Sequence, residues 1–126
     1  MAERVYLTVG EVLRIHHQLI DTYGGAHGIR DTALLESAVF RPQMGYYSSV
    51  AEEAAALMES LANKHPFVDG NKRVAFAAAH TLLLVNGSDL QLEPVAAYEF
   101  MMQALSTGKF RFGPILEWIS KHIRTS

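Results

Sequence analysis

Residues 65–73 place a base, a carboxylate, an amide and two cations within one short stretch, in the order His-Pro-Phe-Val-Asp-Gly-Asn-Lys-Arg. The twelve residues that follow, 74–85, are apolar except for His80 and Thr81. A run of this length that is rich in alanine and leucine predicts a buried helix. The polar stretch would then lie at the helix N-terminus, where free amide groups and the helix dipole favour an anion.

Two cations, Lys72 and Arg73, fall in the first turn of this expected helix. Positive charge there opposes the dipole, which favours acidic residues at that end. The mismatch is expected where a phosphate binds, because the anion offsets both charges and arginine can grip it through two hydrogen bonds. Ordinary surface charge is the alternative interpretation, and it suits either residue alone better than both together.

The other residues of the stretch each allow a chemical and a structural interpretation. His65 is a candidate general base, since an imidazole titrates near neutral pH, or a cation that satisfies the last carbonyls of the preceding helix. Asp69 is a candidate Mg²⁺ ligand or a helix N-cap. Gly70 permits close approach of a ligand or suits the turn, and Asn71 binds phosphate or fixes the loop. Phe67 is expected to anchor the loop in the core.

Capping signals and periodicity predict the helices that must position this stretch. Thr8 and Glu11 have the spacing of a capping box, and apolar residues then follow helical spacing as far as Tyr23. Asp31 is expected to cap a second helix that ends near Arg41. We expect six helices, over 9–23, 32–41, 51–64, 71–85, 94–105 and 114–123, with a proline opening each of the last two and a short extended piece at 88–92.

The composition suits one folded domain. The chain has 126 residues, 49% of them apolar, and no cysteine, which excludes disulfides and thiolate chemistry. A formal charge of −2 and a pI of about 6.3 give no general basic surface for nucleic acid. No signal peptide or membrane span is evident, so we expect a cytoplasmic protein that binds neither nucleic acid nor membrane. The prediction is an all-α fold, a compact single domain over 1–126 with about six helices around a buried central helix.

The stretch 65–73 resembles the signature of the Fic/Doc superfamily, and it is most similar to the Doc (death-on-curing) toxin branch. The Fic pattern is H-P-F-x-[D/E]-G-N-G-R-x-x-R, and here Lys72 replaces its second glycine while Phe76 stands at its final arginine. The ending Asn-Lys-Arg is the Doc form. Weaker matches at 23–25, 28–31, 34–38 and 86–87 extend the resemblance over nearly the whole chain, which implies a Fic/Doc-like helical bundle.

The resemblance to Doc toxins implies a kinase activity. Such toxins move the γ-phosphate of ATP to a threonine of elongation factor Tu and halt protein synthesis. By this resemblance His65 is the general base and Asp69 holds Mg²⁺. The turn that binds the phosphates of ATP would consist of Gly70, Asn71, Lys72 and Arg73.

Departures from the Fic pattern bear on the type of transfer. The side chain of Lys72 fills space that bare glycine leaves open, so the nucleotide is expected to bind with its γ-phosphate next to His65. Transfer of AMP, as in Fic proteins, is an alternative. Lys72 and the missing arginine at Phe76 argue against it. A binding module without activity is a second alternative. The intact signature argues against it. Doc toxins of the phage type carry asparagine where this chain has Ala77. His80, on the same expected helix, is expected to be buried and hydrogen-bonded.

The resemblance also implies a partner that restrains the activity. Fic proteins that inhibit themselves carry the motif [S/T]-x-x-x-E-[G/N], and no stretch here matches it. The restraint is therefore expected from an antitoxin whose disordered C-terminal tail folds into an amphipathic helix in a groove of the toxin. We expect this groove beside the first helix and residues 24–31, with candidate wall residues Tyr23, Met44, Tyr46 and Tyr47.

Overall fold

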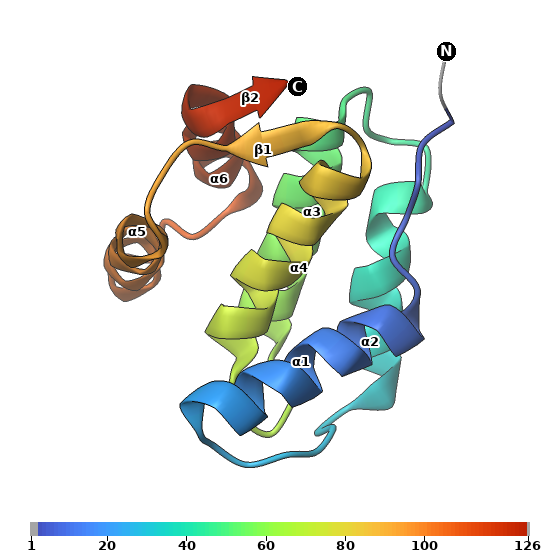
Figure 1. Cartoon of the computed structure of the whole chain (residues 1–126), viewed down its shortest axis with the longest axis vertical. Coiled ribbons are helices and arrows are strands. Elements are labelled where there is room, and N and C mark those ends of the chain that lie inside the picture. Colours follow the sequence, from blue (N-terminus) through green and yellow to red (C-terminus); the bar gives the residue numbers. More distant parts are fainter. Residues whose placement is uncertain (1–2, 126) are drawn as a thin grey trace.

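The structure is a computed structural model, and it describes residues 3–125 (Figure 1). Most of these residues are helical, so the predicted all-α fold is confirmed. The longest helices have 15 residues, and none in the described chain has the length and apolar character needed to span a bilayer. The elements are α1 (Val9–Tyr23), α2 (Thr32–Phe40), the 3₁₀ helix η1 (Arg41–Gln43), α3 (Val50–Lys64), α4 (Asn71–Val85), β1 (Ser88–Leu90), α5 (Pro94–Ser106), α6 (Phe112–His122) and β2 (Ile123–Thr125).

Helices α3 and α4 lie side by side at the centre of the fold, with α1 packed on α4 and α6 on α3 (Figure 1). Both central helices bury alanines, at 54–56 in α3 and at 75, 78 and 79 in α4. Small side chains allow helix axes to approach closely, and larger leucines such as Leu57 and Leu82 complete the core. The predicted central helix is thus confirmed, although Leu84 and Val85 at its end are exposed.

Side-chain caps fix the start of three helices. Glu11 N donates to Thr8 Oγ1 at 3.1 Å and Thr8 N donates to Glu11 Oε1 at 2.9 Å, which is the predicted capping box of α1. Asp31 caps α2 by accepting a hydrogen bond from Leu34 N at 3.0 Å, as predicted. Ser49 caps α3. These caps determine where the intervening loops begin and end.

The end of the chain differs from the prediction. Helix α6 begins at Phe112 and not at Pro114, which is tolerated because amides of a first turn have no intrahelical acceptor. The helix ends at His122, and Ile123 begins β2 where the sequence predicted continued helix. Ile123 pairs antiparallel with Leu90 of β1, the segment that was correctly predicted to be extended. A partner strand therefore replaces a last helical turn.

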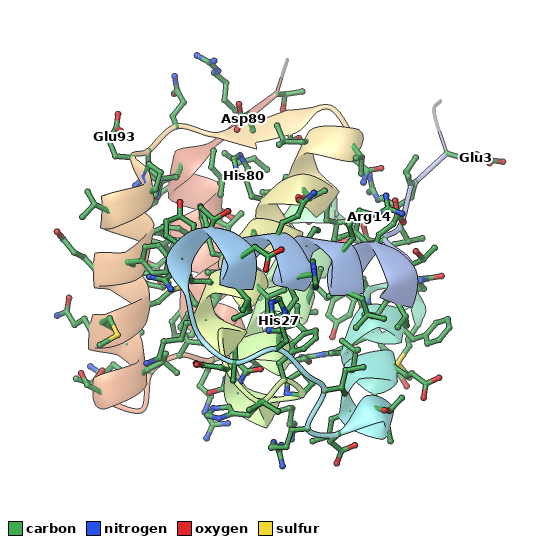
Figure 2. All side chains as sticks on the ribbon, turned by 60° about the horizontal axis from the view of Figure 1, so that its bottom comes forward. Glu3, Arg14, His27, His80, Asp89 and Glu93 are labelled. Atoms are coloured by element: carbon green, nitrogen blue, oxygen red, sulfur yellow. The ribbon has the colours of Figure 1, made fainter. Side chains whose placement is uncertain are left out.

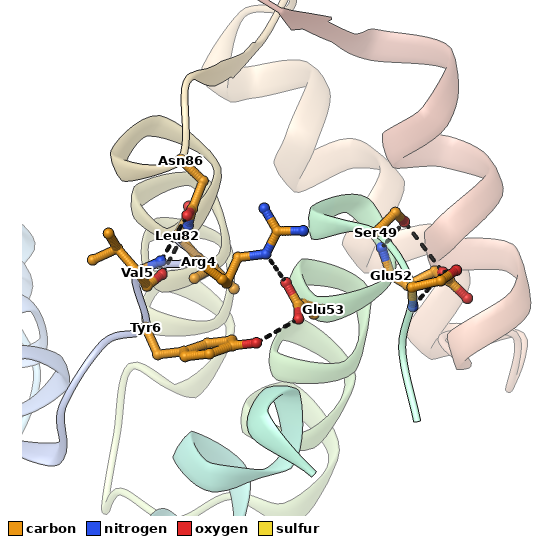
Figure 3. A network of polar contacts seen from close by, with 9 residues as sticks. Arg4, Val5, Tyr6, Ser49, Glu52, Glu53, Leu82 and Asn86 are labelled. Carbon is orange, nitrogen blue, oxygen red and sulfur yellow. Dashed lines mark hydrogen bonds and ion pairs between the residues drawn. The ribbon is translucent and has the colours of Figure 1, made fainter. Parts of the chain in front are cut away.

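Residues 4–6 fasten the N-terminal segment to α3 and to the end of α4 (Figure 3). Arg4 Nε lies 2.6 Å from Glu53 Oε1, and the Tyr6 hydroxyl donates to Glu53 Oε2 at 2.7 Å. The amide side chain of Asn86 accepts from Val5 N and donates to Val5 O, both at 2.8 Å. These contacts join the start of α3 to the end of α4, at the opposite end of this helix pair from residues 65–70.

Candidate functional site

Residues 65–70 form the loop between α3 and α4, and Arg30 holds its first residue in place. His65 is the C-cap of α3 and has a left-handed backbone with φ 53°. Arg30 donates to the carbonyls of Lys64 and His65 at 2.7 and 2.6 Å. The side chain of Arg30 therefore satisfies the last carbonyls of α3. The structural alternative had assigned this role to the side chain of His65. The exposed imidazole of His65 makes no hydrogen bond to other residues among 3–125.

Phe67 anchors this loop in the core, as the sequence predicted, with 1% of its surface exposed. His16 of α1 stacks on it, with ring centroids 3.8 Å apart and planes at 7°. His16 Nε2 lies 2.7 Å from the carbonyl oxygen of Asp69, and because a carbonyl only accepts, this nitrogen carries the proton. Burial lowers the pKa of His16 although this hydrogen bond opposes the effect, which favours a neutral ring. Helix α1 thus supports the loop from within.

Asn71 and Gly70 shape the turn into α4. Asn71 Oδ1 accepts from Phe67 N and Asn71 Nδ2 donates to Phe67 O, both at 3.0 Å, so the loop-fixing interpretation of Asn71 is confirmed. Gly70 is the N-cap of α4 with φ 76°. A Cβ at Gly70 would lie 3.0 Å from Ile20 Cδ1. A left-handed backbone and the close approach of α1 both favour glycine at this position.

The Asp69 carboxylate turns toward residues 24–31. It accepts hydrogen bonds from Gly70 N at 2.9 Å and from Ala26 N at 3.2 Å. The structural alternative, in which Asp69 caps α4, is wrong, because Gly70 occupies that position and no described side chain caps this helix. The carboxylate fits tightly, since a Cβ on Gly25 would lie 2.8 Å from Asp69 Oδ2. Each oxygen accepts one hydrogen bond and keeps a lone pair for a further ligand.

An open cleft of about 460 Å³ lies over the N-terminus of α4. Tyr98 and Met102 of α5 contribute to its lining. The structure brings all the predicted site residues into this one cleft, namely His65, Asp69, Gly70, Asn71, Lys72 and Arg73.

The two cations of the cleft are held differently. The guanidinium carbon of Arg73 lies 4.6 Å from the ring centroid of Tyr23 and 5.9 Å from that of Tyr98, within reach of cation–π attraction. Burial raises the pKa of the Tyr98 phenol, while the positive charge of Arg73 acts in the opposite direction. Lys72 is exposed and forms no ion pair with residues 3–125. The cleft therefore presents one positive charge that lies against aromatic rings and one that is exposed and unpaired among residues 3–125.

Of the residues at which the chain departs from related signatures, Lys72 lines the cleft, whereas Phe76 and Ala77 lie outside it. Phe76 contacts the ring of His80, with centroids 5.6 Å apart, and neither Phe76 nor Ala77 lines the cavity. His80 Nε2 lies 2.7 Å from Asp89 Oδ1, and the two side chains point toward one another in Figure 2. The predicted hydrogen bond of His80 is confirmed. Its predicted burial is wrong, because 32% of the side chain is exposed beside β1.

The candidate wall residues of the antitoxin groove do not lie together. Tyr23 ends α1 beside Arg73, close to the cleft. Met44, Tyr46 and Tyr47 follow η1 at the opposite end of α3 (Figure 1). The prediction is wrong for these three residues, because α2 carries the chain away from residues 24–31 before they occur.

Three supporting residues were not predicted as parts of the site: His16, Arg30 and Tyr98. His16 did show a signal, since it is a histidine at an inward position of the first predicted helix. Arg30 and Tyr98 gave none, because their contacts with the loop depend on how distant segments pack. Each holds a predicted residue in position or completes the cleft wall.

Comparison with known proteins finds a family and a relative that this chain resembles. The model of the Fic/DOC family matches residues 6–83, which include α1 to most of α4 and the whole stretch 65–73. The chain is also similar to a curated protein, Toxin Doc of Mycolicibacterium smegmatis. The two are 44% identical over 91 residues, which cover 68% of this chain and 70% of that protein. Tyr98 and Met102 lie beyond the range that the family model matches.

Proposed function

The chain belongs to the Fic/DOC family, and we propose that it is the toxin of a toxin–antitoxin pair that phosphorylates a protein target. Its similarity to Toxin Doc supports the toxin assignment. The chemistry is supported by one observation: a candidate base, a carboxylate and two cations line one open cleft at an N-terminus that no described side chain caps. Such a cleft suits a substrate rich in phosphate.

In this proposal His65 is the general base. Its exposed imidazole lines the cleft and has no competing hydrogen bond within the described chain. It accepts the proton of the target hydroxyl while that oxygen bonds to the γ-phosphorus of ATP. The bond from this phosphorus to the bridging oxygen breaks, and ADP leaves with the electron pair. Lys72, Arg73 and the amides of the first turn of α4 offset the phosphate charge, so catalysis rests on positioning and electrostatics.

Asp69 is the proposed Mg²⁺ ligand, and its surroundings fit that role. The carboxylate lines the cleft, is fixed by two amide hydrogen bonds and retains acceptor capacity. Mg²⁺ binds proteins through one or two carboxylates together with substrate phosphates and water. When bound, the ion would supply further neutralisation of phosphate charge.

Lys72 favours phosphoryl transfer over AMP transfer. Its side chain lines the cleft one residue before Arg73, where Fic proteins have glycine. A side chain at this position restricts the room beside the amides of α4, which favours an ATP orientation with the γ-phosphate next to His65. Transfer of AMP to a protein hydroxyl is the second candidate function, and a binding module without activity is the third.

By resemblance to Doc toxins, the proposed target is a threonine of elongation factor Tu. The proposed restraint is an antitoxin with a disordered C-terminal tail that folds on binding. A cavity of about 390 Å³ beside α1 supports the expected position of that tail. Its lining includes Leu13 and Ile29, and it extends to Phe67, the buried residue that anchors the site loop.

The test uses ATP labelled separately at the α- and γ-phosphates, incubated with the purified protein and elongation factor Tu, and in parallel with a cell lysate. Label from the γ-position on a protein band supports the kinase. Label from the α-position contradicts it and supports AMP transfer. Absence of label from both, with purified target and with lysate, would leave the binding module as the remaining candidate.

A further inference from the structure

A cluster of three metal-ligating side chains lies outside the cleft, where α1 meets residues 24–31. His17 and Asp21 are one turn apart on α1, and His27 comes from the following loop, which lies beside α1 in Figure 2. Asp21 Oδ2 lies 3.2 Å from His17 Nε2, and Asp21 Oδ1 lies 2.9 Å from His27 Nε2. The two imidazole rings are 4.5 Å apart at their centroids. All three side chains are exposed.

The donor atoms of this cluster suit a transition metal. Two imidazole nitrogens and one carboxylate oxygen form a ligand set typical of Zn²⁺ and similar ions, whereas Mg²⁺ prefers oxygen alone. Ligand bonds of about 2.0–2.2 Å around a tetrahedral ion place neighbouring donor atoms roughly 3.3 Å apart. The donor atoms here all lie within 4.8 Å of one another, so a small rotation of the exposed side chains would bring them to that spacing.

We propose that His17, Asp21 and His27 bind a divalent transition-metal ion of the Zn²⁺ class, with water completing its coordination. The ion would fasten residues 24–31 to α1. Within this segment, Gly24, Gly25 and Gly28 have positive φ angles and every residue from 24 to 30 is exposed. Hydrogen bonds to the site loop hold this segment on one side, and a metal link to α1 would add a restraint on its exposed side.

The opposite side of the same segment holds the site loop. Ala26 N donates to Asp69 Oδ2 at 3.2 Å, and Val68 N donates to Gly28 O at 3.0 Å. The amides of Arg30 and Asp31 donate to the carbonyl of Pro66 at 2.7 and 3.0 Å. A metal ion on α1 would therefore restrict the segment that orients Asp69, and it would do so from outside the cleft.

The experiment is titration calorimetry with ZnCl₂ on the intact protein, in excess Mg²⁺ to occupy Asp69. We expect one Zn²⁺ per chain, and at least a tenfold loss of affinity in His27→Gln and in Asp21→Asn. Asp89→Asn is the matched control, because Asp89 also contacts one histidine, at 2.7 Å, but belongs to no group of three ligands among residues 3–125. Circular dichroism checks that each variant is folded.

Hydrogen exchange supplies a second readout that does not depend on enzymatic activity. Zn²⁺ should slow exchange of the amides in 24–31 in the unchanged protein and leave them unaffected in His27→Gln. The proposal is overturned if no stoichiometric Zn²⁺ binds, because Asp21 then only bridges two histidines by hydrogen bonds. It is also overturned if Asp89→Asn loses as much affinity as His27→Gln, or if exchange in 24–31 does not change.

Discussion

At the scale of the residue, His65 combines an accessible imidazole with a constrained backbone. Its φ of 53° lies in the left-handed region, where asparagine is tolerated better than alanine. His65→Asn therefore removes the proposed base with less backbone strain than His65→Ala. We expect both variants to lose transfer by roughly 10²–10⁴-fold, the usual effect of removing a general base.

Growth arrest on induction and transfer of γ-label both measure this loss, at matched expression of each variant. Thermal unfolding shows whether the fold is kept. Full toxicity in a folded His65→Asn variant would contradict the role of His65 as the base.

Lys72 should act on nucleotide affinity and hardly at all on stability. Its side chain is exposed and forms no ion pair within residues 3–125, and exposed charges contribute little to folding. Lys72→Ala is thus expected to weaken ATP binding in calorimetry with little change in Tm. Arg73→Ala should weaken binding too, with a further loss of about 0.5–1 kcal/mol of stability as the contact with Tyr23 disappears.

The control for these two variants is Lys121→Ala, on the exposed surface of α6. Unchanged ATP affinity in both Lys72→Ala and Arg73→Ala would show that this turn does not bind the phosphates.

Single residues of the cleft could be predicted because they are contiguous in sequence. A base, a carboxylate and two cations within nine residues must lie near one another, and here they occupy the loop and the first turn of α4. His16 and Tyr98 could not be assigned to the site in the same way. His16 reaches Asp69 across 53 positions, and Tyr98 reaches Arg73 from α5, a separate helix that follows β1.

At the scale of the element, one amide side chain, that of Asn71, pairs with both backbone polar groups of Phe67 in the loop 65–70. Asn71→Ala would leave the N–H and C=O of buried Phe67 without their partners. Unsatisfied buried groups cost about 1–3 kcal/mol each, and because both hydrogen bonds are only partly buried we expect a loss in the lower part of the summed range, about 2–3 kcal/mol in the free energy of unfolding. Asn71→Asp keeps the acceptor and should lose less.

Denaturant unfolding measures these differences. Asn63→Ala serves as the control, since Asn63 donates one hydrogen bond to Phe110 O at 2.8 Å and lies in the last turn of α3, just before the loop. A smaller loss of stability for Asn71→Ala than for Asn63→Ala would contradict the proposed role of Asn71 in holding the loop.

The start of an element could be predicted where its signal lies in nearby residues. The end of an element could not be predicted where it depends on a distant segment. The caps at Thr8 and Asp31 act on residues three positions away, so the sequence contains the whole interaction. Strand β2 exists because Thr125 pairs with Ser88, and no pattern near Ile123 announces this partner. The apolar spacing of 115, 116, 119 and 123 therefore predicted one helix where a helix and a strand occur.

At the scale of the whole molecule, the cleft and the N-terminal clasp lie at opposite ends of the α3–α4 pair. The clasp consists of Arg4, Tyr6 and Glu53, together with the pairing of Val5 and Asn86 (Figure 3). Val5 and Asn86 are 81 positions apart in the sequence, and no sequence pattern reveals that they pair. Burial raises the pKa of Tyr6, and its hydrogen bond to Glu53 adds to the effect, so the phenol remains a donor at neutral pH.

The separation of cleft and clasp predicts that stability and nucleotide affinity can be changed independently. Arg4→Ala leaves the buried Glu53 carboxylate with Tyr6 as its remaining partner and should cost about 1–3 kcal/mol of stability, the lower values reflecting the partial exposure of Arg4. ATP affinity should stay the same, the reverse of the result expected for Lys72→Ala. A double-mutant cycle with Glu53→Gln measures the coupling of the pair, which should be favourable since the two side chains are in contact. Zero coupling would show that the clasp does not stabilise the fold. A loss of ATP affinity in folded Arg4→Ala would show that the two ends of the α3–α4 pair are not independent.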